Sequence, residues 1–105
     1  MNTLTKIQMA NLVVNENKKV IIKDMLCKFY GATDVTYKDM PYGILIEVSG
    51  TDSFRFIKDA IVKTLEVKET ALSVLNENKK ALTASYIFLP EKDQNLSKKL
   101  NKMLK

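Results

Sequence analysis

The sequence alternates between two hydrophobic periods, and this alternation constrains the fold more than any other feature. Between residues 34 and 50 the apolar and β-branched residues form two short strand-like segments, and residues 52–66 then place apolar residues every three to four positions. Residues 69–105 repeat this order of two strand-like segments and one helical segment. The pattern therefore predicts two strand–strand–helix units, at 34–66 and 69–105.

Turn residues mark where these strands end. Pro41 presets a turn backbone and Gly43 relieves the far end of that turn, which predicts a β-hairpin in the first unit. In the second unit, residues 72–75 and 81–89 are expected to be strands. Pro90 is expected to end the sheet because proline has no N–H to donate to a neighbouring strand.

The segment before these units is helical in its pattern. Residues 18–30 carry one apolar face, formed by Ile21, Ile22, Met25, Leu26 and Phe29. Asn17 is the expected N-cap of this helix, and Gly31 is expected to end it in the left-handed conformation. Residues 3–14 fit a helix and also a strand, and we favour a helix.

These elements predict an α+β fold. The chain has 105 residues, of which 46% are hydrophobic and 28% charged, so it is large enough to bury a core as a single domain, 1–105. We expect N-terminal helices in 1–31, followed by the two units. Their strands are expected to form one four-stranded, mainly antiparallel sheet with helices 52–66 and 94–104 packed on one face.

The segment NENKK occurs twice, at 15–19 and at 76–80. The first copy continues into a helical period and the second lies between strand-like segments, at the tip of a hairpin. Asn tolerates turn conformations, and Glu and Lys keep a loop hydrated. We therefore interpret the copies as independent surface segments. The alternative is a pair of matched loops that face one partner.

The residue types exclude several kinds of catalysis. The chain has no histidine, which removes Ser-His-Asp and Cys-His nucleophile systems and histidine metal sites. A single cysteine, Cys27, cannot form an internal disulfide or a zinc site. We expect no enzymatic activity, no metal and no cofactor. Cys27 is expected to be a small, half-buried residue near Val20, and the alternative is a second apolar stripe that packs on a partner.

Composition also bears on source and location. Arg55 is the single arginine among 17 basic residues, and lysine and asparagine are frequent, as in proteins of A·T-rich genomes. This points to a low-GC bacterium, or to a phage or plasmid within one. The N-terminus lacks the pattern of a signal peptide and no apolar stretch reaches ~18 residues, so we expect a cytoplasmic protein without a membrane span.

Two groups of residues are candidate binding sites. The first is the tip of the predicted hairpin, where Met40 and Tyr42 flank Pro41, together with Tyr37 on the adjoining strand. Aromatic side chains often dominate the energy of protein interfaces. The alternative is that Met40 and Tyr42 fold back onto the sheet. The second group is a set of lysines in the last helix that suit a phosphate backbone or an acidic protein surface, the alternative being an ordinary solvated face: Lys98, Lys99, Lys102 and Lys105.

We expect a small non-enzymatic binding protein that docks on another protein as a regulatory or inhibitory accessory protein. Its partner can be a host protein or a second copy of the chain, so a homo-oligomer is compatible with the sequence. The alternative is a nucleic-acid-binding protein that uses the C-terminal lysines. The net charge of +5 comes mostly from those lysines. With only one arginine, such binding would contact phosphates with little sequence preference.

Overall fold

The computed structural model describes residues 4–103, and for residues 94, 97, 101 and 103 it describes the backbone alone. The described residues form helices and strands in the order α1 (Lys6–Val13), α2 (Glu16–Tyr30), β1 (Asp34–Met40), β2 (Gly43–Ser49), α3 (Phe54–Leu65), β3 (Leu72–Asn78), β4 (Thr83–Phe88) and α4 (Gln94–Met103). Two short 3-10 turns, η1 (Glu69–Ala71) and η2 (Pro90–Lys92), flank the second hairpin. The α+β fold class is confirmed.

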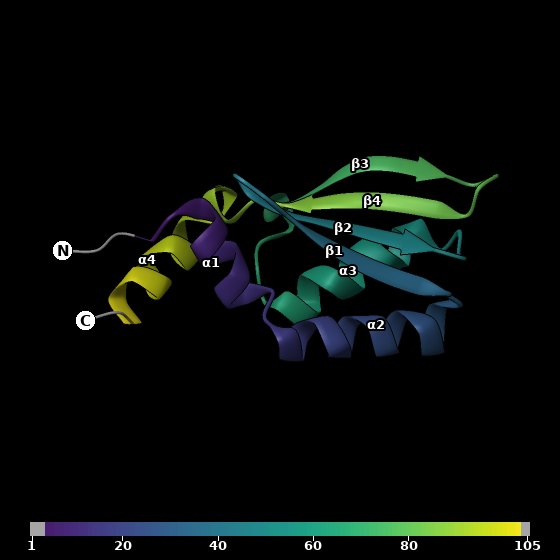
Figure 1. Cartoon of the computed structure of the whole chain (residues 1–105), viewed down its shortest axis with the longest axis horizontal. Helices are drawn as coiled ribbons and strands as arrows, with labels where there is room; N and C mark the ends of the chain where they lie inside the picture. Colours follow the sequence, from purple (N-terminus) through teal and green to yellow (C-terminus); the bar gives the residue numbers. More distant parts are fainter. Residues whose placement is uncertain (1–3, 104–105) are drawn as a thin grey trace.

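The four strands form one antiparallel sheet in the order β1-β2-β4-β3. Helices α2 and α3 run side by side along one face of this sheet (Figure 1). The last helix differs from the expected position, because α4 lies beyond the end of the sheet, beside α1 (Figure 1). The second hairpin is followed by the turn η2, which leads the chain away from the sheet before α4 begins.

The core fills the space between the sheet and these helices. Alternate residues of the two central strands face the helices, so one side of each strand is apolar. The largest fully buried side chains of the core include Ile44 and Ile46 of β2, Tyr86 and Phe88 of β4, Ile22 and Leu26 of α2, and Ile57 and Ile61 of α3. Helix α1 adds Met9, Ala10 and Val13 to the same cluster.

The described part of the N-terminal segment forms α1, which confirms the favoured helical interpretation, and residue 3 lies outside the described residues. A capping box at Thr5 and Gln8 begins α1. The predicted N-cap of α2 is wrong by two residues, because Asn15 caps the helix and Asn17 lies inside its first turn. The Asn15 side chain accepts a hydrogen bond from the Lys18 backbone N–H at 2.9 Å. Gly31 ends α2 with φ of 78°, as predicted.

The two NENKK segments belong to different kinds of element. The first caps and begins α2, whereas the second completes β3 with Asn76–Asn78 and enters the turn with Lys79 and Lys80. The second copy therefore reaches further into the strand than expected. The start of α2 and the β3–β4 connection also lie at opposite ends of the sheet (Figure 1). This separation disfavours one shared site formed by both copies.

Tyr37 and Tyr86 both face the helices, and they differ in whether the side-chain hydroxyl has a hydrogen-bond partner. The Tyr86 hydroxyl is buried and has no hydrogen-bond partner among the described residues, whereas the Tyr37 hydroxyl donates to the Lys19 carbonyl at 3.2 Å. Because an unpaired buried hydroxyl costs free energy, Tyr86→Phe is expected to raise the free energy of unfolding by about 1 kcal/mol. Tyr37→Phe removes a formed bond and is expected to lower it by roughly 0.5–1.5 kcal/mol. Urea unfolding of both variants checks the opposite signs, and a destabilised Tyr86→Phe protein would contradict the prediction.

Candidate interaction surface

Three of the described helices expose large apolar side chains, and in α1 this residue is Leu12, which is 49% exposed. In α2, Val20 is 67% exposed, Ile21 42% and Phe29 74%, and in α3 Phe56 is 60% exposed. We call Phe29 and Phe56 the helical-layer patch. A single exposed apolar residue is ordinary on a protein surface. An exposed phenylalanine on each of two adjacent helices is less ordinary, because exposed apolar groups often mark interaction sites.

Phe29 belongs to the apolar stripe of α2 but lies beyond its buried part. Ile22 and Leu26 are both completely buried, and Phe29 follows Leu26 by three residues, slightly less than one turn. The helix ends at Gly31, immediately after this turn. The sequence placed Ile21 and Phe29 on the core-facing side of this helix, so their exposure differs from that pattern.

Phe56 was not identified from the sequence. The three-to-four spacing of apolar residues predicted over 52–66 corresponds to the buried side of α3, since Phe54, Ile57, Ile61 and Leu65 are all buried. Phe56 lies between the first two of these positions and outside the three-to-four spacing, so it points away from the core. A phenylalanine outside an otherwise regular stripe is the signal that sequence reasoning could have used.

The arrangement of the two helices places both phenylalanines at the same end of the pair. Helices α2 and α3 run in opposite directions along the sheet (Figure 1). The Lys18 ammonium, at the start of α2, donates to the Thr64 carbonyl near the end of α3 at 2.8 Å. The last turn of α2, with Phe29, therefore lies at the same end as the first turn of α3, with Phe56.

A shallow depression of about 300 Å³ lies on α2 and is lined by Val20, Lys23, Asp24 and Cys27. Cys27 is a free cysteine of intermediate burial and packs against the core cluster, as the favoured interpretation expected. It also lines the depression beside Val20. Val20 precedes Phe29 by nine residues, or two and a half turns, so this depression lies on the opposite side of α2 from Phe29.

The structure does not bring the three predicted hairpin residues together. Tyr37 faces the helices, where its hydroxyl bonds to the Lys19 carbonyl and the Lys19 ammonium lies 5.5 Å from the centre of its ring. Burial raises the pKa of the Tyr37 phenol above its ordinary value. Met40 is three residues further along β1 and therefore lies on the opposite face of the sheet, where it is half-buried. Tyr42 lies in the turn itself and is 43% exposed.

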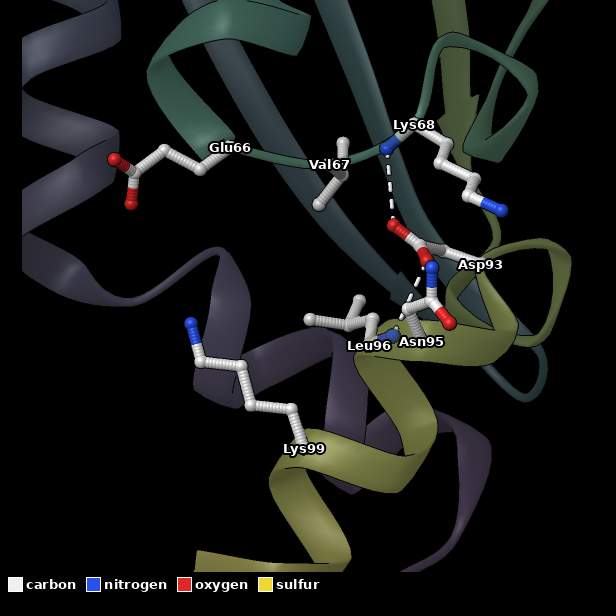
Figure 2. Close-up of a pocket in the computed structure, with 7 residues that line it drawn as sticks. All are labelled: Glu66, Val67, Lys68, Asp93, Asn95, Leu96 and Lys99. Carbon is white, nitrogen blue, oxygen red and sulfur yellow. Dashed lines mark hydrogen bonds between the residues drawn. The ribbon is translucent and has the colours of Figure 1, made fainter.

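The predicted lysines lie at the other end of the molecule from Phe29 and Phe56. Lys98, Lys99 and Lys102 are exposed on α4, and Lys105 lies outside the described residues. A pocket of about 240 Å³ separates Lys99 from the segment that follows α3, and Glu66, Val67 and Lys68 line its other side (Figure 2). The Asp93 carboxylate joins the two sides, because it accepts hydrogen bonds from the backbone N–H groups of Lys68 at 2.9 Å and Leu96 at 3.1 Å.

Within residues 4–103, no three His, Cys, Asp or Glu side chains gather as a metal ion would require. No described helix is both long enough and apolar enough to cross a membrane. Comparison of the chain with protein-family models, with curated proteins and with solved structures finds no match.

Proposed function

We propose that the protein is a small non-enzymatic binding protein that docks on another protein through the helical-layer patch. The observation that carries this proposal is the exposure of Phe29 and Phe56, at 74% and 60%, at one end of the same helix pair. Their partner is a protein other than this chain, and the contact is an apolar one.

Exposed phenylalanines favour a protein partner because their burial in a pocket of that partner contributes binding free energy. Removing a phenylalanine side chain from water contributes roughly 1.5–3 kcal/mol. Such residues act as anchors when they enter a pocket on the partner, and a few of them carry most of the binding energy. The α2–α3 pair is held to the sheet by a continuous core. A rigid support of this kind reduces the entropy that is lost when the anchors bind.

The lysine-rich, arginine-poor composition supports an origin in a low-GC bacterium, or in a phage or plasmid within one. For a protein of this size we propose a regulatory or inhibitory role in the cytoplasm of that cell. Docking by a few aromatic anchors suits such a role, because the protein then acts by occupying a surface of its partner.

The test replaces Phe29 and Phe56 with serine and measures capture of partners from lysate of the source cell. We expect the double variant to bind its specific partner roughly a thousandfold more weakly, because two anchors of about 2 kcal/mol each are removed and each 1.4 kcal/mol is tenfold in affinity. Its melting temperature should change little, since both side chains are exposed. Leu75→Ser is the matched control, because Leu75 is 58% exposed on β3, away from both helices.

A second double variant, with Met40 and Tyr42 replaced by serine, compares the hairpin tip with the patch. If that variant loses the partner while the Phe29 and Phe56 variant retains it, the docking surface is the hairpin and not the helical layer.

Sedimentation of the wild type and both variants addresses self-association. A concentration-dependent dimer that disappears only in the Phe29 and Phe56 variant would show that the occupant is a second copy of the chain.

A further inference from the structure

Three lysines are grouped on the outer side of α4. Lys98, Lys99 and Lys102 are separated by one and by three positions, so they occupy adjacent positions on one side of the helix. All three are exposed, and the segment 94–103 contains no acidic residue. We call them the lysine stripe.

The packing of α4 fixes the direction in which this stripe points. Leu100 is 9% exposed and belongs to the core cluster, and Leu96 packs against that cluster. The Asp93 carboxylate bonds the Leu96 N–H and so holds the first turn of the helix in place (Figure 2). The leucines therefore face inward, and the helix cannot roll to bury the lysines.

The charges near the stripe leave it positive. The nearest acidic residue before α4 in the chain, Asp93, is buried and accepts two backbone hydrogen bonds. Glu91 is engaged by Lys6 at 2.8 Å, and this hydrogen bond lowers the pKa of its carboxyl. Glu66 lies across the pocket from Lys99 and is the acidic group that partly offsets the stripe (Figure 2).

The chemistry of the stripe fits phosphate better than an apolar protein surface or a membrane. Lysine is depleted in protein interfaces, because the centres of these interfaces are apolar and aromatic. The described leucines of α4 are turned inward, so they add no apolar contact beside the lysines. A helix that lies on a membrane needs a free apolar face, and the described leucines of α4, Leu96 and Leu100, are already used in packing. Lysine is a compact point charge that suits sequence-independent contact with phosphates.

We infer that the lysine stripe of α4 binds the phosphate backbone of nucleic acid with little sequence preference. This surface is separate from the helical-layer patch, which lies on other helices. Each phosphate contact releases counterions, so three contacts give a dependence of log affinity on log salt with a slope of about −3 for duplex DNA.

The test measures fluorescence anisotropy of labelled duplexes of two unrelated 20-base-pair sequences at several salt concentrations. One variant replaces Lys98, Lys99 and Lys102 with glutamine. The matched control replaces Lys28, Lys79 and Lys80, three exposed lysines at the opposite end of the sheet, and lowers the net charge equally. We expect the stripe variant to lose 2 to 3 units of slope, at about 0.9 per contact, and the control to keep its slope.

An equal loss in both variants would assign binding to net charge and overturn the inference, and so would an unchanged slope in the stripe variant. Failure of the wild type to bind either duplex at 50 mM salt would also overturn it. If poly-glutamate competes as well as DNA on an equal-charge basis, the surface recognises acidic chains in general and the assignment to nucleic acid is wrong. Replacing Phe29 and Phe56 should leave the slope unchanged, which keeps this test independent of the docking proposal.

Discussion

Replacing Gly43 with alanine is expected to lower the free energy of unfolding by about 3 kcal/mol or more, and to unfold the protein if its stability is marginal. Gly43 begins β2, where this strand passes close to the end of β4. A methyl group at Gly43 would overlap the Phe88 carbonyl oxygen and lie 3.1 Å from its carbonyl carbon. Both atoms belong to the backbone, so the two central strands would have to separate.

Gly31→Ala is the comparison for this variant. At Gly31 nothing lies within 4 Å of an added methyl group, but the backbone φ is 78°. The substitution therefore introduces strain alone, which costs about 1–2 kcal/mol. Denaturant unfolding of both variants measures the difference. A Gly43→Ala protein that is no less stable than the Gly31→Ala protein would show that the two strands can move apart at little cost.

Gly43 also illustrates what the sequence can and cannot predict. Its position two residues after Pro41 correctly indicates a hairpin turn, because local backbone preferences decide such turns. Its contact with Phe88 depends on β2 being adjacent to β4, and that strand order is set by tertiary packing. The units 34–66 and 69–105 and the helix before them were predictable for the same local reason. The position of α4 beyond the sheet was not, because it depends on where η2 directs the chain.

The candidate sites show the same limit. Tyr37 and Met40 are separated by three residues, so the alternation of a strand already places them on opposite faces, and the sequence alone could have separated them. The exposure of Phe29 has no comparable local signal. Phe29 follows Ile22 by seven residues, which is the spacing of a residue on the buried face of a helix. Whether it is buried depends on how far the sheet and α3 extend along α2, and Phe29 remains exposed.

Asp93→Ala is expected to lower the free energy of unfolding by about 3 kcal/mol, because it removes the acceptor of two backbone hydrogen bonds in a buried site. Asp93 is 5% exposed, and its two oxygens bond separately to Lys68 and Leu96. The carboxylate thus caps α4 and ties the segment after α3 to it. In the alanine variant both N–H groups lose their acceptor, and each loss costs about 1–3 kcal/mol. Urea unfolding measures the total.

Asp93→Asn separates the two contributions. Its amide keeps one oxygen in place, so it can retain one of the two bonds, and we expect roughly half of the alanine loss. Limited proteolysis between 94 and 103 should also be faster in the alanine variant, because α4 is no longer capped at its first turn. The lysine stripe would then lose its fixed direction while its charge stayed the same. If Asp93→Ala cost less than about 1 kcal/mol, the carboxylate would not hold α4 to the body, and the orientation assigned to the stripe would lack its main support.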